Sequence, residues 1–247
     1  MGSTAIVTGG SRGIGADIVR RLARAGHHVL LVYSADDRGA EETATRCATA
    51  DVAVEPLKCD ITADDAPAGI FDAAARLGTP TTLVNNAGTT GAISPLSEAS
   101  DETIRTVIDV NLTATIRLCR EAMCRWQEAD GLPRSIVNVS SVAAKIGSPG
   151  EYVWYAAAKA GVNALTTGLA VEAAPLGIRV NAVNPGTTNT TIHTRAGRPN
   201  RAEEAGRRSP MGRPAEPDEI AAAVEWLVST EASYVNGTIL DVAGGVR

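Results

Sequence analysis

The sequence predicts an α/β fold in which a doubly wound parallel sheet carries helices on both faces. Short apolar runs alternate along the chain with longer segments whose apolar residues recur at helical spacing. The runs are apolar at consecutive positions, which is typical of strands buried on both faces, and strand–helix–strand crossovers are right-handed. The length of 247 residues fits one such unit, so we expect a single domain over residues 1–247.

The first strand, helix and strand come from residues 4–33. The apolar run at 4–8 predicts a buried strand. A helix is expected at 14–25, because apolar residues recur there on one face and Gly26 follows as a typical helix stop. The second apolar run, at 28–33, predicts the second strand.

The middle of the chain repeats this alternation. We expect helices at 39–50 and 63–77, separated by a strand at 53–59. A fourth strand at 82–86 leads into a long helix at 101–127. Each pair of strands is therefore separated by a helix, which is the connection that parallel pairing requires.

The last third contains three more strands. The run at 135–140 predicts the fifth strand, and a helix at 152–174 connects it to the sixth strand at 179–183. A helix at 217–229 and a strand at 238–242 complete the pattern. Alternating elements of this kind indicate one parallel sheet with helices packed against both of its faces.

The least regular segment, residues 187–213, lies between the sixth strand and the last helix. It is rich in Gly, Pro, Arg and Thr, and it is too long for a plain connector. It is either a surface excursion or a lid over a substrate. Ligands of parallel α/β sheets bind beyond the carboxyl ends of the strands, and this segment follows such an end, so we favour the lid.

Composition excludes several classes of function. The net charge of −5, with Lys and Arg scattered along the chain, gives no basic surface for nucleic acid. No apolar run is long enough to span a bilayer and no signal segment is evident, so we expect no membrane association and a soluble, cytoplasmic protein. Four cysteines and three histidines show no metal-binding spacing, so no metal site is expected.

A glycine-rich turn joins the first strand to the first helix. Gly9, Gly13 and Gly15 would let the backbone turn tightly and approach a pyrophosphate, whose negative charge the helix N-terminus attracts. Their spacing, Gly-x3-Gly-x-Gly, differs from the Gly-x-Gly-x-x-Gly of the standard dinucleotide fingerprint. Glycines also fill ordinary turns, but this position in a strand–turn–helix unit favours a nucleotide site.

Tyr155 and Lys159 lie one helical turn apart in the expected helix at 152–174. Residues four apart share a helix face, so the lysine cation can lie beside the phenol and lower its pKa toward neutrality. Such a phenol would exchange a proton with a substrate oxygen while a bound nucleotide exchanges a hydride. The pair therefore indicates carbonyl/alcohol redox chemistry.

Several motifs in this order resemble the short-chain dehydrogenase/reductase family. The resemblance covers essentially the whole chain and implies a Rossmann-type sheet of about seven strands in a homotetramer or homodimer. The motifs that carry it are the turn at 8–15, Asn85-Asn86-Ala87-Gly88, Asn111, Ser140-Ser141, Tyr155-x3-Lys159, Asn184-Pro185-Gly186, Pro210-Met211-Gly212-Arg213 and Gly244-Gly245.

The resemblance also implies a set of residues around a nicotinamide dinucleotide. Asp60 and Ile61 would border the adenine, Asn86-Ala87-Gly88 the ribose and nicotinamide, and the residues after the sixth strand the carboxamide and phosphates. The full set is Gly9, Ser11, Arg12, Gly13, Ile14, Gly15, Tyr33, Asp60, Ile61, Asn86, Ala87, Gly88, Tyr155, Lys159, Pro185, Gly186 and Thr188.

The end of the second strand favours NADP(H) over NAD(H). An acidic residue there would hold the ribose 2′-hydroxyl and repel a 2′-phosphate, but Tyr33-Ser34-Ala35 supplies none. Arg12, with Arg38 as a further candidate, would instead pair with the 2′-phosphate. Asp36-Asp37 follow closely, and a loop that folded back would reverse this preference.

Four residues resemble the catalytic tetrad of the family. Tyr155 would donate the proton to the carbonyl oxygen, and Lys159 would lower its pKa and bind the nicotinamide ribose. Ser141 would fix the substrate oxygen, because a hydroxyl both donates and accepts. Asn111, through its side chain or a local helix distortion, would hold a water that relays protons to Lys159.

Two neighbours compete for these roles. Tyr152 lies seven residues from Lys159, so it is less well aligned than Tyr155. Ser140 competes with Ser141 because side chains alternate at a strand end, and we select Ser141. The interval from Ser141 to Tyr155 is about one residue longer than the commonest family spacing, which leaves the serine assignment open to test.

The substrate class stays open between a 3-oxoacyl thioester and a sugar, a polyol or another small ketone. A reductase of carrier-protein substrates would place basic residues around its cleft, but Val171 precedes Glu172 of the catalytic helix. Arg125 and Arg134 remain candidates for carrier-protein docking. A nucleotide-binding regulatory protein without turnover is the alternative to an enzyme, although all four tetrad positions hold competent residues.

Overall fold

Seven strands build the protein, and the structure, a computed structural model, describes residues 2–127, 131–192, 196–198 and 200–246. Each pairing is parallel. The strands are β1 (Ser3–Thr8), β2 (His28–Tyr33), β3 (Val54–Lys58), β4 (Thr79–Asn85), β5 (Arg134–Val139), β6 (Ile178–Pro185) and β7 (Ile239–Val242).

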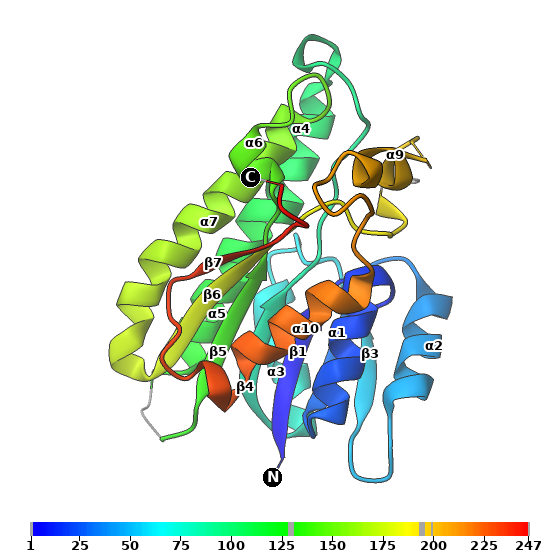
Figure 1. Ribbon diagram of the computed structural model, residues 1–247. Helices are drawn as coiled ribbons and strands as arrows, with labels where there is room; N and C mark the ends of the chain where they lie inside the picture. Colours follow the sequence, from blue (N-terminus) through cyan, green and yellow to red (C-terminus); the bar gives the residue numbers. More distant parts are fainter. Residues whose placement is uncertain (1, 128–130, 193–195, 199, 247) are drawn as a thin grey trace.

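The strands form one sheet in the order β3-β2-β1-β4-β5-β6-β7 (Figure 1). From β1 the chain first moves outward through β2 to β3, and it then returns to the other side of β1 to add β4. The connection that follows β1 therefore runs toward one edge of the sheet, and the connection that follows β4 runs toward the other edge. This reversal leaves a crevice beyond the carboxyl ends of these two strands. The predicted doubly wound fold is confirmed.

Helices cover both faces of this sheet (Figure 1). The α-helices are α1 (Gly13–Arg24), α2 (Asp37–Cys47), α3 (Ala66–Leu77), α4 (Asp101–Ile108), α5 (Ala114–Arg125), α6 (Ala143–Ile146), α7 (Val153–Ala173), α9 (Arg201–Arg207) and α10 (Pro217–Val228). One face of the sheet packs against α1, α2 and α10, and the other face packs against α3, α5 and α7.

The central strand β1 shows why its residues are apolar at consecutive positions. Ile6 belongs to the apolar layer against α3 and α5, whereas Ala5 and Val7 belong to the layer against α1 and α10. All three side chains are fully buried. Truncating one such side chain as large as Ile6 to alanine costs about 2–5 kcal/mol, so these layers hold the crevice in place.

The expected long helix at 101–127 is interrupted. It divides into α4, a π-helical turn η2 (Asp109–Thr113) and α5. Within this stretch the Asn111 amide donates to the carbonyl of Val107 at 2.8 Å, and the Thr115 hydroxyl donates to that of Asn111 at 3.0 Å. Side chains thus donate hydrogen bonds to backbone carbonyl oxygens that lose their usual helical partner in the wider π-helical turn.

Two short helices lie where no helix was expected. α6 follows β5, and α9 lies within the segment 187–213 at the carboxyl end of the sheet (Figure 1). Single turns η1 (Leu96–Glu98), η3 (Ala174–Leu176) and η4 (Thr230–Ala232) complete the described elements. No helix in the described part of the chain is both long and apolar enough to cross a membrane.

Candidate active site

Two adjoining cavities lie beyond the carboxyl ends of the strands. The larger, of about 390 Å³, follows the glycine turn and the ends of β2 and β4. The smaller, of about 150 Å³, contains the end of β5 and the N-terminal part of α7. Ile14, Asn86, Gly88, Thr190 and Ile192 line both, so the two cavities form one continuous cleft.

The glycine turn admits no side chain at its closest points. A Cβ atom on Gly15 would lie 2.1 Å from the carbonyl oxygen of Gly9. A Cβ atom on Gly9 would lie 2.9 Å from the Cα atom of Ala87, and Gly9 and Gly13 have φ values of +69° and +53°. Glycine is therefore required here for steric and conformational reasons.

The N-terminus of α1 points its backbone N–H groups into the larger cavity. Arg12, the N-cap residue, makes no capping side-chain bond, and the first turn contains no acidic residue. The turn residues Gly9, Ser11, Gly13, Ile14 and Gly15 all line the cavity. Free N–H groups and the positive end of the helix dipole fit the pyrophosphate of a dinucleotide.

Asn86 and Thr8 fasten the end of β4 to this turn. The Asn86 amide donates to the carbonyl oxygens of Thr8 and Gly9 at 2.9 and 3.1 Å. The backbone N–H groups of Asn86 and Ala87 both donate to the Thr8 hydroxyl at 3.0 Å. Thr8 belongs to the turn at 8–15 that the sequence analysis identified, but the role of its hydroxyl was not predicted, because a threonine at a strand end has no distinctive spacing.

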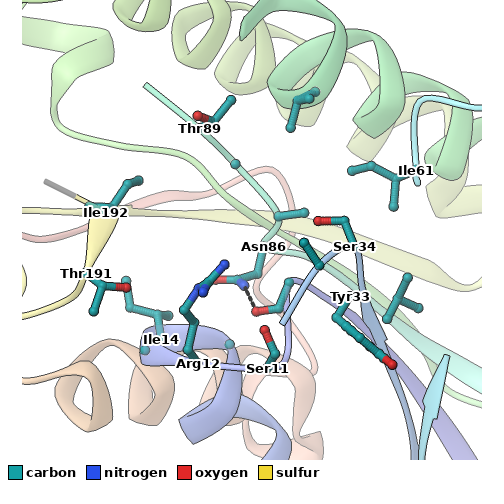
Figure 2. Close-up of a pocket in the computed structure, with 18 of the residues that line it drawn as sticks. Ser11, Arg12, Ile14, Tyr33, Ser34, Ile61, Asn86, Thr89, Thr191 and Ile192 are labelled. Carbon is teal, nitrogen blue, oxygen red and sulfur yellow. Dashed lines mark hydrogen bonds between the residues drawn. The ribbon is translucent and has the colours of Figure 1, made fainter. Parts of the chain in front are cut away.

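The end of the cavity where the sequence analysis expected the adenosine, the adenosine end, is lined by Arg12, Tyr33 and Ser34, whereas Asp36 and Asp37 do not line it. Asp36 caps α2 and accepts from Arg12 at 3.1 Å. Arg12 projects into the cleft, while the Tyr33 ring points away from the other labelled residues (Figure 2). The ring hydroxyl donates to Asp37, which also pairs with Lys58 at 2.9 Å.

Asp60 and Ile61 line the same cavity beyond the end of β3. The Asp60 carboxylate accepts from the backbone N–H and the hydroxyl of Thr62 at 2.9 and 2.7 Å. These two bonds, the backbone one first, lower the pKa of Asp60. Ile61 and Ser34 lie on the same side of the cavity (Figure 2), so an apolar and a polar side chain adjoin there.

Tyr155 and Lys159 both line the smaller cavity from α7. Both side chains are almost fully buried, and the Lys159 Nζ atom lies 5.7 Å from the centroid of the Tyr155 ring. The same Nζ atom donates to the carbonyl of Val139 at 2.8 Å. The helical spacing thus brings amine and phenol together at the end of β5, as expected.

The pKa values of this pair differ from the expected pattern. Burial raises the pKa of Tyr155 above its usual range, and the hydrogen bond with Ser141 opposes part of that rise. Burial also lowers the pKa of Lys159 to about 8. The sequence analysis expected the lysine charge to lower the phenol pKa. In this cleft, the loss of water around both groups has a larger effect on their pKa values than the charge of the lysine has on the phenol.

Asn111 lies directly behind Gly88, in the π-helical turn. Its amide donates to the carbonyl of Thr89 at 2.7 Å, and its Oδ1 atom is buried without a hydrogen-bond partner among the residues described. A Cβ atom on Gly88 would lie 2.7 Å from that oxygen and 3.6 Å from the Lys159 Nζ atom. The acceptor and the amine therefore flank the same small glycine.

The geometry distinguishes Ser141 from Ser140. The Ser140 hydroxyl donates to the carbonyl of Lys159 at 2.9 Å, so it binds the helix backbone. The Ser141 hydroxyl accepts from the N–H of Ala143 at 3.1 Å, and it is close enough to the Tyr155 phenol to lower the pKa of that phenol. Ser141 is therefore the serine beside the phenol.

Tyr152 occupies a different position, at the N-cap of α7. Its ring meets that of Tyr155 edge to face, with centroids 5.4 Å apart and an interplanar angle of 87°. Burial raises the pKa of its hydroxyl, and Arg201 and Ser148 rather than Lys159 oppose that rise. Ser148 has a φ of +46°, the one positive value at a residue other than glycine in the described backbone.

The segment 187–213 begins beside the cleft. Pro185, Gly186 and Thr188 line the smaller cavity, and the Thr188 hydroxyl donates to the carbonyl of Gly186 at 3.0 Å. Thr191 and Ile192 border the larger cavity opposite Ile61 (Figure 2). Residues 193–195 and 199 of the expected lid lie outside the described residues.

Comparisons with known proteins agree with this architecture. Residues 9–247 match the family model described as Enoyl-(Acyl carrier protein) reductase. The 3beta-hydroxysteroid dehydrogenase 1 of Eggerthella lenta is 41% identical over 247 residues, which cover 99% of this chain and 94% of the relative. The cis-4-hydroxycyclohexanecarboxylate dehydrogenase of Sinomonas cyclohexanicum is 40% identical over 98% of this chain and 95% of the relative.

A solved structure shares the whole fold. The 3-ketoacyl-(acyl-carrier-protein) reductase of Brucella melitensis, complexed with NADH, superposes with a TM-score of 0.90. It is 32% identical, and the match covers 99% of this chain and 98% of that protein.

Proposed function

The chain belongs to the short-chain dehydrogenase/reductase family and is an NAD(P)-dependent oxidoreductase of CH–OH groups, and from this premise we propose that it interconverts a ketone and a secondary alcohol with Tyr155 as the acid–base residue. The observation that carries the proposal is that Tyr155, Ser141 and Lys159 line one cavity, which is continuous with the nucleotide cleft. When bound, the nicotinamide supplies or accepts the hydride.

Tyr155 donates its proton to the carbonyl oxygen during reduction and takes it back during oxidation. Burial raises the pKa of this phenol, so in the structure as it stands Tyr155 is protonated near neutral pH and competent as an acid. Ser141 lines the cavity beside the same phenol, so its hydroxyl can also donate to the substrate oxygen. Two donors thus meet the oxygen at which negative charge develops.

Lys159 and Asn111 act behind the phenol. With a pKa of about 8, Lys159 remains mostly protonated at neutral pH, and its charge favours proton release from Tyr155 once a substrate oxygen competes for that proton. The unpaired Oδ1 atom of Asn111, beside the same amine, is suited to accept from a bridging water. Such a water would connect Lys159 to the proton supply.

We propose NADP(H) as the preferred cofactor. Arg12 lines the adenosine end of the cleft, and its partner Asp36 is itself occupied as the cap of α2. Asp37 is engaged by Tyr33 and Lys58 outside the cavity. Neither carboxylate is therefore aimed at a ribose 2′-hydroxyl, while a cation and the Ser34 hydroxyl are available to a 2′-phosphate.

We propose a small ring ketone or ring alcohol as the substrate. The two relatives named above act, by their names, on hydroxyl groups carried by a steroid and by a cyclohexane ring. The smaller cavity is lined by Ile146, Val142 and Ile192 besides the polar groups, so it offers apolar surface to a ring.

A 3-oxoacyl thioester is the second candidate, favoured by the family description and by the Brucella melitensis neighbour. The carrier protein that holds such a thioester would meet little basic surface on this protein. Arg125 is paired with Glu121 and Asp72, both at 2.8 Å, and Arg134 is buried. Val171, at the position where a basic residue was sought, is 75% exposed and uncharged.

We also propose that the protein works as a homodimer or homotetramer. Val171 of α7, Trp226 of α10 and Tyr234 are large apolar side chains that remain exposed on the single chain. Burial of such side chains between copies would give a stable interface. Light scattering of the purified protein distinguishes these states from a monomer.

A substrate screen tests the proposed reaction. Reduced-nicotinamide absorbance would be followed with cyclohexanones, sugars and acyl thioesters, each with NADPH and NADH, and with the corresponding alcohols in the reverse direction. We expect turnover of ring ketones with NADPH above that of acyl thioesters. Turnover restricted to thioesters would select the second candidate, and the absence of turnover in every class would contradict the proposed reaction.

A further inference from the structure

A second polar centre lies in the smaller cavity, built around Arg201 of α9. Arg201 and Lys159 are the cationic side chains among the described lining residues of this cavity, and none of these residues is acidic. The Arg201 side chain is only 11% exposed. A guanidinium so far removed from water needs acceptors, and the cavity itself supplies hydroxyl groups but no counter-charge.

Glu151 supplies the counter-charge from outside the cavity. Its carboxylate accepts from the Nε atom of Arg201 at 3.1 Å and from the Nη2 atom. Glu151 does not line the cavity, whereas Arg201 does, so the guanidinium lies between the carboxylate and the cleft. Neither contact uses Nη1, which leaves donors of the guanidinium for another acceptor.

Tyr152 holds the guanidinium in position. The Arg201 Cζ atom lies 5.3 Å from the centroid of the Tyr152 ring, so the cation packs against the aromatic ring. The Tyr152 ring also contacts the Tyr155 ring, with centroids 5.4 Å apart. Arg201, Tyr152 and Tyr155 therefore lie next to one another in the lining of a single cavity, so one ring substrate can meet both the guanidinium and the phenol.

We propose that Arg201 is a specificity-determining residue that binds a carboxylate of the substrate. This carboxylate is carried on the side of the substrate ring opposite to the reacting carbon. Glu151 and Tyr152 are the positioning residues of Arg201. This inference rests on the proposed reaction at Tyr155 and names the substrate class more closely. A carboxylate fits better than a neutral acceptor because it matches the planar donor edge of a guanidinium with two oxygens.

The test compares 4-oxocyclohexanecarboxylate with cyclohexanone as substrates. For the wild type we expect kcat/KM for the acid to exceed that for the neutral ketone by at least about tenfold, as for charge-assisted hydrogen bonds. Arg201→Leu should reduce this ratio about 10- to 100-fold. Glu151→Gln should raise it, because glutamine keeps an acceptor that positions the guanidinium but removes the competing negative charge. Arg207→Leu, at an exposed position of the same helix, should leave the ratio unchanged.

The ratio separates recognition from a purely structural role. If Arg201 only anchored α9, Arg201→Leu would lower both kcat/KM values together, and that result, like equal wild-type rates for acid and ketone, would overturn the proposal. Calorimetry with cyclohexanecarboxylate, which has no carbonyl to reduce, provides a readout independent of turnover. We expect Arg201-dependent binding to the complex with NADP, stronger than that of cyclohexanecarboxamide.

These measurements also distinguish the two proposals. Turnover of cyclohexanone without discrimination for the acid would leave the proposed reaction intact and refute the carboxylate site. Arg201-dependent binding of cyclohexanecarboxylate, together with no turnover of either ketone, would support the site and contradict the reaction.

Discussion

The two ends of the cleft are built by different means. At the nucleotide end, backbone geometry determines the site: Gly9 and Gly15 approach other chain segments too closely for any side chain, and helix N–H groups provide the charge complement. At the catalytic end, the side chains of Tyr155, Lys159 and Asn111 are buried together. Their chemistry depends on how much water they have lost.

This difference predicts which substitutions and which changes of pH should affect each end of the cleft. A site made of backbone contacts should be sensitive to one added methyl group and insensitive to pH. A site made of buried titratable groups should tolerate changes of shape better, but its behaviour should change with protonation. Three substitutions, from the largest expected effect to the smallest, test this contrast.

The largest effect is expected at the nucleotide end, for Gly15→Ala. The new Cβ atom would lie 2.1 Å from the carbonyl oxygen of Gly9, and because that neighbour is backbone the turn must move. We expect loss of measurable dinucleotide binding and a decrease in the free energy of unfolding on the order of 3 kcal/mol. Fluorescence titration and chemical denaturation provide the two measurements.

A matched control uses a glycine inside α3. A Cβ atom on Gly69 would meet no atom within 4 Å, and the residue has a helical conformation. Gly69→Ala should therefore keep dinucleotide affinity and stabilise the protein by about 0.4–1 kcal/mol. Equal effects of the two substitutions would show that the turn is no more constrained than an ordinary helix.

The next effect concerns the pH dependence of stability through Lys159. Burial lowers the pKa of Lys159 in the folded protein to about 8, below that of an unfolded lysine. Between these two pKa values the unfolded chain binds the extra proton, so the free energy of unfolding rises with pH in that window. Below pH 8 the buried charge opposes folding fully.

Lys159→Met removes this titration while it keeps most of the volume. From pH 7 to pH 10 the free energy of unfolding of the wild type should rise by about 2 kcal/mol relative to the variant. Urea denaturation at pH 7, 8.5 and 10 measures the difference. Parallel pH profiles for the two proteins would mean that Lys159 keeps an ordinary pKa in the folded state.

The smallest effect is expected at the adenosine end, for Arg12→Ala. Loss of a charge-assisted contact with the 2′-phosphate should weaken NADPH binding about tenfold and change NADH binding little. Arg38→Ala is the control, because the Arg38 side chain is 89% exposed and does not line the cleft. Tighter binding of NADH than of NADPH by the wild type would contradict the proposed cofactor preference.

The sequence allowed the nucleotide end to be predicted more completely than the catalytic end. Glycine spacing directly indicates close backbone approach, and the strands were recognisable because residues such as Ile6 and Val7 are buried on opposite faces. The position of Asp36, which caps α2 and pairs with Arg12, depends on loop geometry that leaves no pattern in the sequence.

At the catalytic end, the proximity of Tyr155 and Lys159 was predictable from the sequence, but their electrostatics was not. The spacing of Tyr155 and Lys159 indicated a shared helix face, but it carries no information about burial, which raises one pKa and lowers the other. The π-helical turn at Asn111 arises from side-chain bonds to the backbone. Arg201 lies in a segment without periodicity, so its contact with Glu151 was not predicted.

The most direct test of the account combines dinucleotide affinity and turnover in Tyr155→Phe, which removes only the phenol oxygen. We predict that dinucleotide binding stays within about twofold of the wild type, while kcat/KM for the best ketone falls by about 10²- to 10⁴-fold. Turnover within tenfold of the wild type, with the dinucleotide still bound, would show that another group transfers the proton and would contradict the central claim.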